Sequence, residues 1–585
     1  MSKVLQGIIM KPTEQLFGQG VRRSKDKDTR RYNLFAARLI ADLIKNSLGP
    51  CGMEKMFIDV LGEVTVTKDG ATLLRKLDIE HPAAKVLIEA SNAVDNEVGD
   101  GTTSVVVLAG ALLQKAEQLL DRGISPSIIA DGYLKGLEIS LKTLEDIAQI
   151  SKNSDREIME RLATTSLRSK IISYTISKQN NVAAKLVVDA ICTITDFANN
   201  QVNVDDIKIE EKPGNMSDIQ LVKGVVIDKT IDNSAMPRRI ENAKILLINE
   251  DLEGKRTKTD AEIRILSPDQ IQAYLDKQSL ILRLKVQNII NLRANVVISQ
   301  KGINLLAQSY LAKAGIISIR RVKENDLLWL EKATGAKIVR DLDNNIISDK
   351  YLGYAGNVYE KFVGNDKMVF VEDCKNPKSV TILLRANSKR LLDECHRSIL
   401  DAIAVIKDFI IKPSIVAGGG SPEAIIASRI RRQARLISGR EQIVVEKFAE
   451  ALEEIPLIIA TNAGMNIVDT LVQLRSKCSS SSSAIPPSND GKVSRWYGVN
   501  AIERKVEEMF SNAIEPSLVK EQVIKTAVEV TNLLISVDDV LMAKPVMNIH
   551  THADGTEHSH PGGDKKHDHY FDKLGKRQRP MHHYY

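Results

Sequence analysis

Apolar residues recur at helical spacing along the first 150 residues of the chain and again after residue 388. Residues 31–48 carry an apolar side chain at nearly every third or fourth position, and Gly49-Pro50 follows them, so we predict a helix that ends at this turn. Residues 103–120 are apolar on almost every face, which predicts a buried helix. The same spacing predicts further helices over 133–149, 388–412 and 421–437.

Between residues 224 and 386 the pattern changes to short apolar runs. They predict strands over 224–229, 243–249, 295–300, 316–322 and 380–386. Because these runs alternate with helical segments, we predict an α/β insert inside a mainly helical frame. A shorter alternating run at 62–70 predicts one more strand, which ends in a turn at Asp69-Gly70.

Two stretches lack apolar periodicity. Residues 479–483 are five serines followed by a polar, proline-containing stretch, which is typical of a flexible surface loop. The tail from about Pro545 holds eight of the ten histidines, and we expect 546–585 to be disordered.

The amino-acid composition excludes some classes of binding partner. The 585 residues are 43% hydrophobic and 27% charged, as in a globular protein with several domains. The net charge is only +6 and 4% of residues are aromatic, so we expect neither nucleic acid nor a membrane surface as a partner. Five scattered cysteines without a C-x-x-C pair, and an N-terminus without a signal-peptide pattern, predict a cytoplasmic location.

The segment Asp100-Gly101-Thr102-Thr103 stands directly before the buried helix. Glycine lets the backbone approach a ligand closely, and the unpaired N–H groups of a helix N-terminus favour a phosphate. An aspartate at such a turn can hold Mg²⁺. The alternative is an ordinary helix cap, because Asp and Thr are common capping residues.

Two other glycine turns have the same two interpretations. Asp69-Gly70 is either a simple turn or part of a site. Residues 418–420 are three glycines before Ser421 and Pro422, which can open a helix and can also admit a ligand against bare backbone. Neither a G-x-x-x-x-G-K-[ST] loop nor a G-x-G-x-x-G turn is present, so the sequence indicates a phosphate site of an unusual type.

The predicted helix at 388–412 carries Glu394, Asp401 and Asp408 at seven-residue spacing, close to one stripe. A solvent-exposed face is the default interpretation of such a stripe. The alternative is a carboxylate that orients water for attack on phosphorus, and periodicity does not choose among the three. The opposite stripe is apolar and predicted to be core: Leu392, Cys395, Ile399, Ala402, Ile403 and Ile406.

Several segments, taken in order, carry a family resemblance. They are 36–56 (AARLIADLIKNSLGPCGMEKM), 66–85 (VTKDGATLLRKLDIEHPAAK), 95–104, 224–253, 294–339, 367–385, 401–423 (ending in AGGGSPE) and 533–543 (LLISVDDVLMA). On these segments the chain resembles the group II chaperonins, the family of the archaeal thermosome and the eukaryotic cytosolic chaperonin. The likeness covers roughly residues 20–545, and the middle resembles an archaeal thermosome subunit most.

The resemblance implies a multidomain chaperonin fold through which the chain passes outwards and back. A mostly α-helical equatorial ATP-binding domain would comprise 1–152 and 412–545. An α/β intermediate hinge domain would comprise 153–223 and 375–411. An α/β apical, substrate-binding domain would comprise 224–374, with a helical protrusion, the built-in lid, at about 252–290. Ser267 as a cap and Pro268 in the first turn independently predict a helix there.

The resemblance also implies roles for individual residues. ATP and Mg²⁺ would be the cofactors, with Asp100 as the magnesium ligand and Asp69 and Asp401 as the catalytic residues that orient the attacking water. The nucleotide-binding residues would be Leu48, Gly49, Pro50, Gly70, Gly101, Thr102, Thr103, Lys170, Gly418, Gly419 and Glu515. Among them, Lys170 would sense the terminal phosphate and Glu515 would contact the ribose. The chain departs from the family pattern at two places. Arg168-Ser169 stands before Lys170 where archaeal members usually have Thr-Gly, and Cys51 follows Pro50 where a basic residue is usual.

The implied function is an ATP-dependent molecular chaperone that encloses non-native proteins in a double-ring cavity closed by built-in lids. Partners would be identical or paralogous subunits in stacked eight- or nine-membered rings, and client proteins. The alternative is a hydrolysis-poor structural ring partner in a hetero-oligomer. The tail departs from the family, and its paired histidines are either metal ligands or part of a solvated, pH-responsive tail: His550, His552, His558, His560, His567 and His569.

Overall fold

The computed structural model describes residues 22–25, 27–59, 61–77, 79–168, 170, 182–253, 268–342, 349–481, 496–542, 547–551 and 557–561. Contacts divide the chain into a large unit, Asn33–Ser536, and a small unit, Met1–Tyr32 with Val537–Tyr585. Three large hydrophobic cores lie within the large unit; two of them combine separate parts of the chain, and the third comes from one stretch, 225–374.

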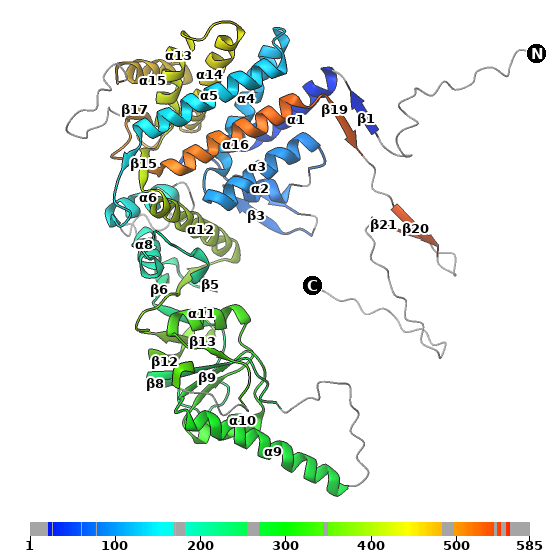
Figure 1. The fold of residues 1–585 in the computed structure, drawn as a ribbon, viewed down its shortest axis with the longest axis vertical. Helices are drawn as coiled ribbons and strands as arrows, with labels where there is room; N and C mark the ends of the chain where they lie inside the picture. Colours follow the sequence, from blue (N-terminus) through cyan, green and yellow to red (C-terminus); the bar gives the residue numbers. More distant parts are fainter. Residues whose placement is uncertain are drawn as a thin grey trace, which may run out of the picture. The chain divides into compact units, whose positions relative to one another are not determined.

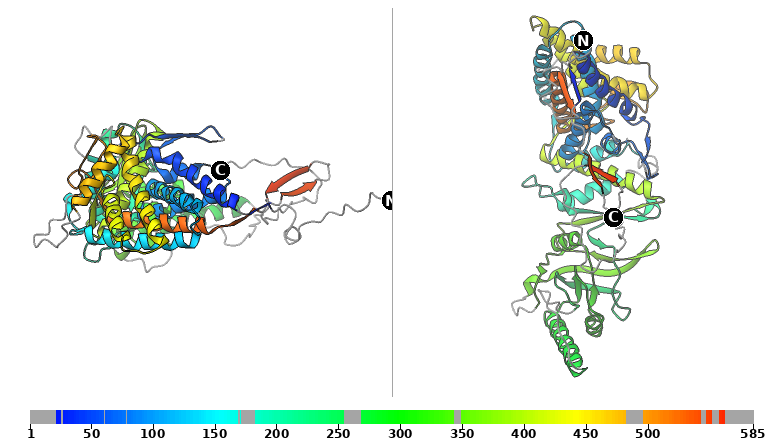
Figure 2. Two further views of the ribbon diagram at one scale, coloured as in Figure 1. Left: turned by 90° about the horizontal axis from the view of Figure 1, so that it is seen from above. Right: turned by 90° about the vertical axis from the view of Figure 1, so that its right-hand side faces the viewer.

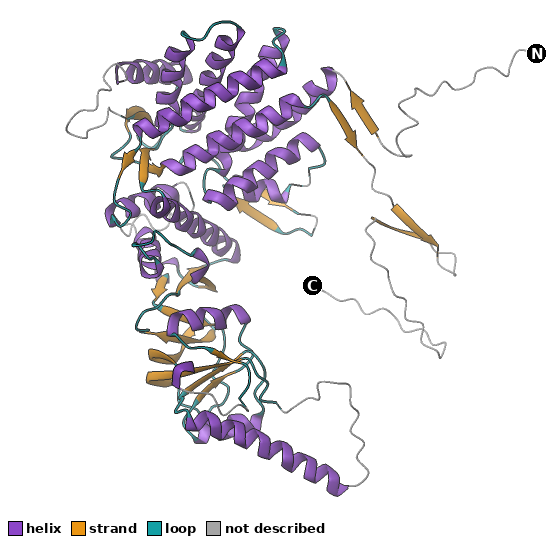
Figure 3. Cartoon of the chain, viewed as in Figure 1, coloured by secondary structure: helices purple, strands orange, loops and turns teal. Residues whose placement is uncertain are grey.

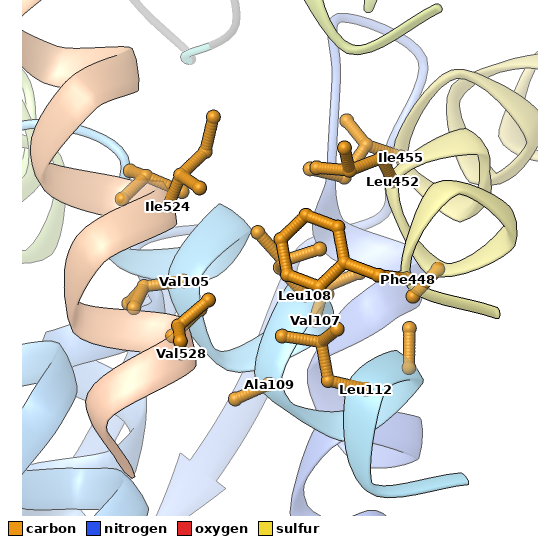
Figure 4. Packing of buried hydrophobic residues seen from close by; sticks show 14 of the residues in the cluster. Val105, Val107, Leu108, Ala109, Leu112, Phe448, Leu452, Ile455, Ile524 and Val528 are labelled. Atoms are coloured by element: carbon orange, nitrogen blue, oxygen red, sulfur yellow. The ribbon is translucent and has the colours of Figure 1, made fainter. Parts of the chain in front are cut away.

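The first core is helical and combines the beginning of the large unit with its end (Figures 1 and 3). Its helices are α1 (Lys27–Ile44), α2 (Gly70–Lys76), α3 (Pro82–Val98), α4 (Thr102–Asp121), α5 (Pro126–Ile147), α13 (Ser421–Ala434), α14 (Arg440–Asn462), α15 (Ile467–Ser481) and α16 (Ser517–Ser536). α4 packs against both α14 and α16, and Figure 4 shows Leu108 of α4 beside Phe448 of α14. Because α4 is apolar on almost every side, neighbouring helices pack around it, and this packing fixes its position.

Short strands lie at the margin of this helical core. β2 (Lys55–Ile58) and β3 (Val64–Thr67) form an antiparallel hairpin, as do β16 (Tyr497–Asn500) and β17 (Lys505–Glu508). A three-stranded sheet has the order β18-β15-β4, with β4 at Gln149–Ile150, β15 at Ser414–Ala417 and β18 at Ile514–Pro516. In this sheet Val416 is paired with Glu515. The pairing brings the glycines after β15 close to the carboxylate of Glu515.

The second core joins residues before 217 to residues after 379. It contains α6 (Arg156–Arg168), α8 (Val182–Ile194), α12 (Lys389–Ile411) and a sheet of order β5-β14-β6, at Ile207–Pro213, Val380–Ala386 and Gln220–Val222. The predicted apolar stripe of α12, from Leu392 to Ile406, is buried here. This part of the prediction is confirmed.

The third core is the α/β insert, built on a seven-stranded sheet of order β10-β9-β8-β12-β13-β7 with β11 beside β8. The strands are β7 (Gly224–Ile227), β8 (Arg239–Ile248), β9 (Val296–Ser299), β10 (Ile317–Ile319), β11 (Ile338–Val339), β12 (Gly353–Val363) and β13 (Asp366–Glu372). The helices are α9 (Pro268–Asn291), α10 (Leu305–Lys313) and α11 (Glu324–Thr334). α9 packs on α10 by its C-terminal half, while its N-terminal half extends past the sheet (Figures 1 and 2).

The small unit contains two strand pairs. β1 (Arg22–Lys25) pairs antiparallel with β19 (Asp539–Met542). β20 (Met547–Thr551) pairs antiparallel with β21 (Glu557–Pro561), within the tail for which we expected no order. His550 stands opposite His558 in this register. His552, His567 and His569 lie outside the described residues.

Most predicted elements are present with small shifts at their ends. The buried helix predicted at 103–120 is α4, and the helix predicted after Ser267 is α9, which is described from Pro268 onwards. Two predictions are wrong. β3 ends at Thr67 and Asp69 caps α2 instead of forming a simple turn, and α15 continues into the serine run as far as Ser481. The rest of the predicted loop lies outside the described residues.

Candidate functional site

A cavity of about 1330 Å³ lies within the large unit, a volume sufficient for a nucleotide-sized ligand. Its wall combines turns from both ends of the unit with the β16–β17 hairpin, β18 and the N-terminal part of α16. These predicted contacts line it: Leu48, Gly49, Pro50, Asp100, Gly101, Gly419 and Glu515. Residues separated by hundreds of positions in the sequence therefore meet at one cavity.

The turn between α3 and α4 shapes one side of the cavity. Gly101 is the N-cap of α4 with φ +82°, and a Cβ added there would lie 2.7 Å from Cγ2 of Val523 on α16. The backbone N–H of Gly101 donates to Asp100 Oδ1 over 2.7 Å. No side chain caps α4, so the interpretation of this segment as an ordinary Asp or Thr cap is wrong. The helix N-terminus instead reaches the cavity wall, where it favours an anion.

Asp69 is tied to the start of the same helix. Thr102 donates its hydroxyl to Asp69 Oδ1 over 3.0 Å, and the backbone N–H of Thr72 donates to Asp69 Oδ2 over 2.8 Å. Burial raises the pKa of Asp69, but the hydrogen bonds from Thr72 and Thr102 and the charge of Lys170 outweigh it and hold the pKa below its usual value. Asp69 is therefore a partly buried carboxylate in a fixed orientation.

Lys170 links Asp69 to Asp401. Its ammonium forms an ion pair with the carboxylate of Asp401 on α12, and both side chains are largely buried, at 10% and 17% exposure. The same ammonium lowers the pKa of Asp69, so it lies near both carboxylates. Asp69, Lys170 and Asp401 thus form one charged cluster, which we call the Lys170 cluster.

The Lys170 cluster lies outside the cavity wall. Among the described residues, these predicted contacts do not line the cavity: Asp69, Gly70, Thr102, Thr103, Lys170, Asp401 and Gly418. Thr102 connects the cluster to the wall, because it follows Gly101 directly and bonds to Asp69. Gly70 packs on Thr103, and a Cβ at Gly70 would lie 2.7 Å from the Thr103 hydroxyl.

The three stripe acids of α12 have different surroundings. Glu394 is 2% exposed and pairs with Arg397, while Asp408 is 1% exposed. Of the three, only Asp401 contacts Lys170 among the described residues. The default interpretation of the stripe as a solvent-exposed face is wrong, because Glu394 and Asp408 are buried and the side chain of Asp401 is only 17% exposed.

Asp408 is buried without a hydrogen-bond partner for either carboxylate oxygen in the described part of the chain. Burial, together with the charges of Asp100 and Glu97, outweighs Lys407 and raises the pKa of Asp408 to about 7. The folded protein therefore binds more protons than the unfolded chain between about pH 4 and pH 7. Over this window Asp408 lowers the free energy of unfolding as the pH rises.

We expect Asp408→Asn to be more stable than the parent at and above pH 7, by up to about 4 kcal/mol, because the variant has no carboxylate to ionise. The gain should shrink towards zero near pH 4. Chemical denaturation at a series of pH values measures it. Asp408→Glu keeps a titrating group and should keep the parent's pH dependence. An offset of Asp408→Asn that is independent of pH would contradict this explanation.

Two charged residues beside Glu515 were missed by sequence reasoning: Lys520, which also lines the cavity, and Glu423, which does not. Lys520 Nζ lies 2.8 Å from Glu515 Oε2 and 3.0 Å from Glu423 Oε1. Gly418 lies on the other side of Glu515, where a Cβ would be 2.9 Å from Oε1. Glu423 stands inside the segment AGGGSPE that carries the resemblance, and Lys520 lies five residues after Glu515, but nothing in the sequence indicates that the two meet.

No cluster of three or more His, Cys, Asp or Glu side chains suited to a metal ion occurs among the described residues. The proposed histidine ligands of the tail stay a prediction, since their side chains lie outside that description. Of the helices in the described ranges, none is both long and apolar enough to cross a membrane.

Comparison with known proteins agrees with this arrangement. The model of the TCP-1/cpn60 chaperonin family matches residues 40–545. The thermosome subunit alpha of Aeropyrum pernix is 43% identical, over 89% of this chain and 93% of its own length. The thermosome subunit alpha of Archaeoglobus fulgidus is 44% identical (90% and 94%), and the thermosome subunit of Methanocaldococcus jannaschii is 42% identical (93% and 97%). The chain therefore belongs to the TCP-1/cpn60 chaperonin family, whose members are ATPases that couple hydrolysis to protein folding.

Proposed function

We propose that this chain binds Mg²⁺-ATP in the 1330 Å³ cavity and hydrolyses it with the help of the Lys170 cluster. The observation that carries the proposal is the bond between Thr102 and Asp69, which joins the cavity wall to a partly buried carboxylate with a lowered pKa. A nucleotide held at the wall would present its terminal phosphate towards that carboxylate.

The wall fits a nucleotide on three counts. The N-terminus of α4 offers N–H groups to phosphates. Gly419 has φ +68°, and a Cβ there would lie 2.6 Å from the carbonyl oxygen of Val499, so only bare backbone fits at that position. Leu48, Gly49 and Pro50 supply a turn along which the nucleoside can lie.

Asp100 fits the role of magnesium ligand. Its carboxylate lines the cavity and is oriented by the Gly101 N–H. Mg²⁺ is commonly bound through one or two carboxylates and the phosphates of the substrate, so one aspartate suffices. The bound ion would neutralise charge on the phosphate oxygens.

Asp69 and Asp401 would orient the attacking water, and Lys170 would contact the terminal phosphate. In the structure, Lys170 is paired with Asp401. A terminal phosphate that attracts the Lys170 ammonium would release the Asp401 carboxylate to accept a hydrogen bond from water. Positioning of this kind, with electrostatic stabilisation, is the main contribution that proteins make to phosphoryl transfer.

For the assembly, we propose two stacked rings, each with eight or nine identical or paralogous subunits, located in the cytoplasm. Residues 224–374 would bind non-native clients, and the segment at about 252–290 would act as the lid. Two exposed leucines of α9, Leu280 and Leu284, support an apolar contact surface there. Archaeoglobus fulgidus has alpha and beta thermosome subunits at 44% and 43% identity, so similarity does not choose between self and paralogous partners.

A hydrolysis-poor structural ring partner is the second candidate. The full Lys170 cluster and Asp100 argue against it, because a subunit that only builds the ring has no need of them. The two candidates differ in turnover rather than in assembly.

We expect the purified chain to hydrolyse ATP in a magnesium-dependent manner, to form stacked rings and to protect a denatured client from protease when ATP is added. Phosphate release, negative-stain imaging and a protection assay measure these properties. Rings without hydrolysis would favour the structural partner, and hydrolysis without rings would contradict the proposed assembly.

A further inference from the structure

Lys520 joins a carboxylate of the cavity wall to a second, buried carboxylate. It lies in the first turn of α16, directly after β18, which carries Glu515. The side chains of Lys520 and Glu423 are 8% and 2% exposed, while that of Glu515 is 28% exposed and lines the cavity. Lys520 and Glu515 both line the cavity and Glu423 does not, and Glu515 is the most exposed of the three charged groups.

Lys520 is the cation that offsets the negative charges of Glu423 and Asp100 around Glu515. Burial holds the pKa of Glu515 above its usual value; Lys520 lowers it in part, and the carboxylates of Glu423 and Asp100 raise it further. Burial favours the neutral form of Lys520, but its two carboxylate partners outweigh this and raise its pKa above the usual value. Lys520 is thus a permanent cation that favours the ionised form of Glu515.

Both oxygens of Glu515 are restrained. Oε2 is held by Lys520 at 2.8 Å, and Oε1 lies over Gly418, where a Cβ would come within 2.9 Å. The backbone of Glu515 is fixed by its pairing with Val416 in the sheet. An ionised carboxylate only accepts hydrogen bonds, whereas the protonated form also donates one. Its fixed orientation and its charge therefore suit a hydroxyl donor in the cavity.

We propose that Lys520 is a positioning residue that holds Glu515 as an oriented carboxylate to accept a hydrogen bond from a ribose hydroxyl, and that it thereby sets the preference for ATP over deoxy-ATP. This rests on the proposed binding of nucleotide in the cavity. Glu423, which does not line the cavity, is the second ion-pair partner of Lys520.

The test compares hydrolysis of ATP, 2′-deoxy-ATP and 3′-deoxy-ATP by the full-length assembled protein. Lys520→Met removes the cation but leaves Glu423 buried without it, which costs stability. We therefore introduce Lys520→Met both alone and together with Glu423→Gln. Glu423→Gln by itself is the matched control, since it keeps the pair between Lys520 and Glu515.

Glu423→Gln should retain the preference for ATP. Adding Lys520→Met should raise the KM for ATP about tenfold, as expected for the loss of a hydrogen bond to a charged group, with kcat nearly unchanged. The KM for the deoxynucleotide that lacks the bonded hydroxyl should change little. Glu515→Gln should give the same pattern, and Lys520→Arg should restore most of the preference.

Different outcomes separate the two levels of the proposal. If Glu515→Gln loses the preference while both Lys520→Met variants keep it, the role of Lys520 is overturned and that of Glu515 stands. If Glu515→Gln also keeps the preference, Glu515 does not read the ribose and both roles are overturned. Absence of ATP hydrolysis in the parent protein would reject the proposed function itself. Equal losses for all three nucleotides would assign Lys520 a purely structural role.

Discussion

Asp401→Ala is expected to bind ATP and to lose nearly all turnover, by about 10²–10⁴-fold in kcat. Asp401 lies outside the cavity wall, so its removal should leave the contacts to the nucleotide in place. What the variant loses is a carboxylate that could orient water beside Asp69. ATP-driven closure of the rings, followed by small-angle scattering, should be lost with turnover if closure requires hydrolysis.

Two further variants make this result specific. Asp401→Asn keeps the shape of the side chain and removes the charge, so it should be nearly as inactive as Asp401→Ala. Leu400→Ala alters the adjacent exposed position on α12 and should hydrolyse ATP normally. Turnover in Asp401→Ala at the parent rate would refute the catalytic role, and loss of ATP binding would mean that Asp401 acts on the nucleotide site itself.

The sequence predicts best those features that depend on neighbouring residues. α4 follows from an apolar run too complete for a surface helix, and α9 follows from a serine and a proline at a helix entry. Both signals lie within a few residues of the element that they define. Local backbone preference and burial agree at these positions, so the pattern and the structure agree as well.

Asp69 marks the limit of that local reasoning. An Asp-Gly pair after a strand is typical of a turn, and the short run from Gly70 to Lys76 has no strong helical signal. It becomes helical because Asp69 caps it and because Leu73 and Leu74 are buried in the helical core. The decisive contacts come from packing, which a strand-and-turn pattern does not contain.

The prediction that the acidic residues of α12 face solvent is wrong for a related reason. A stripe of acidic residues indicates solvent only when nothing covers it, and all three acids of this stripe are largely buried. Glu394 is accommodated by Arg397 and Asp401 by Lys170, whereas Asp408 carries a raised pKa. The choice of Asp401 came from the family resemblance, and the ion pair with Lys170 gives that choice a physical basis.

Asp100→Asn is expected to raise the concentration of Mg²⁺ needed for half-maximal hydrolysis by at least tenfold, since loss of even an outer partner of a metal ligand commonly costs 10–100-fold in affinity. An amide oxygen is a weaker ligand than a carboxylate for a hard cation. The amide can still accept the Gly101 N–H through its oxygen, so the turn that begins α4 should persist. Titration of ATP hydrolysis with Mg²⁺ at saturating nucleotide measures the change.

Ser104→Ala is the matched control, because Ser104 lines the same cavity in the first turn of α4 and carries no charge. It should keep the magnesium requirement of the parent. The two proposed roles of this wall, magnesium binding and phosphate binding, can then be distinguished by how each variant responds to added Mg²⁺. Loss of a magnesium ligand is offset by more Mg²⁺, whereas damage to the phosphate-binding helix N-terminus is not. If high Mg²⁺ fails to restore Asp100→Asn while its affinity for free ATP also falls, Asp100 shapes the phosphate site and another group holds the ion.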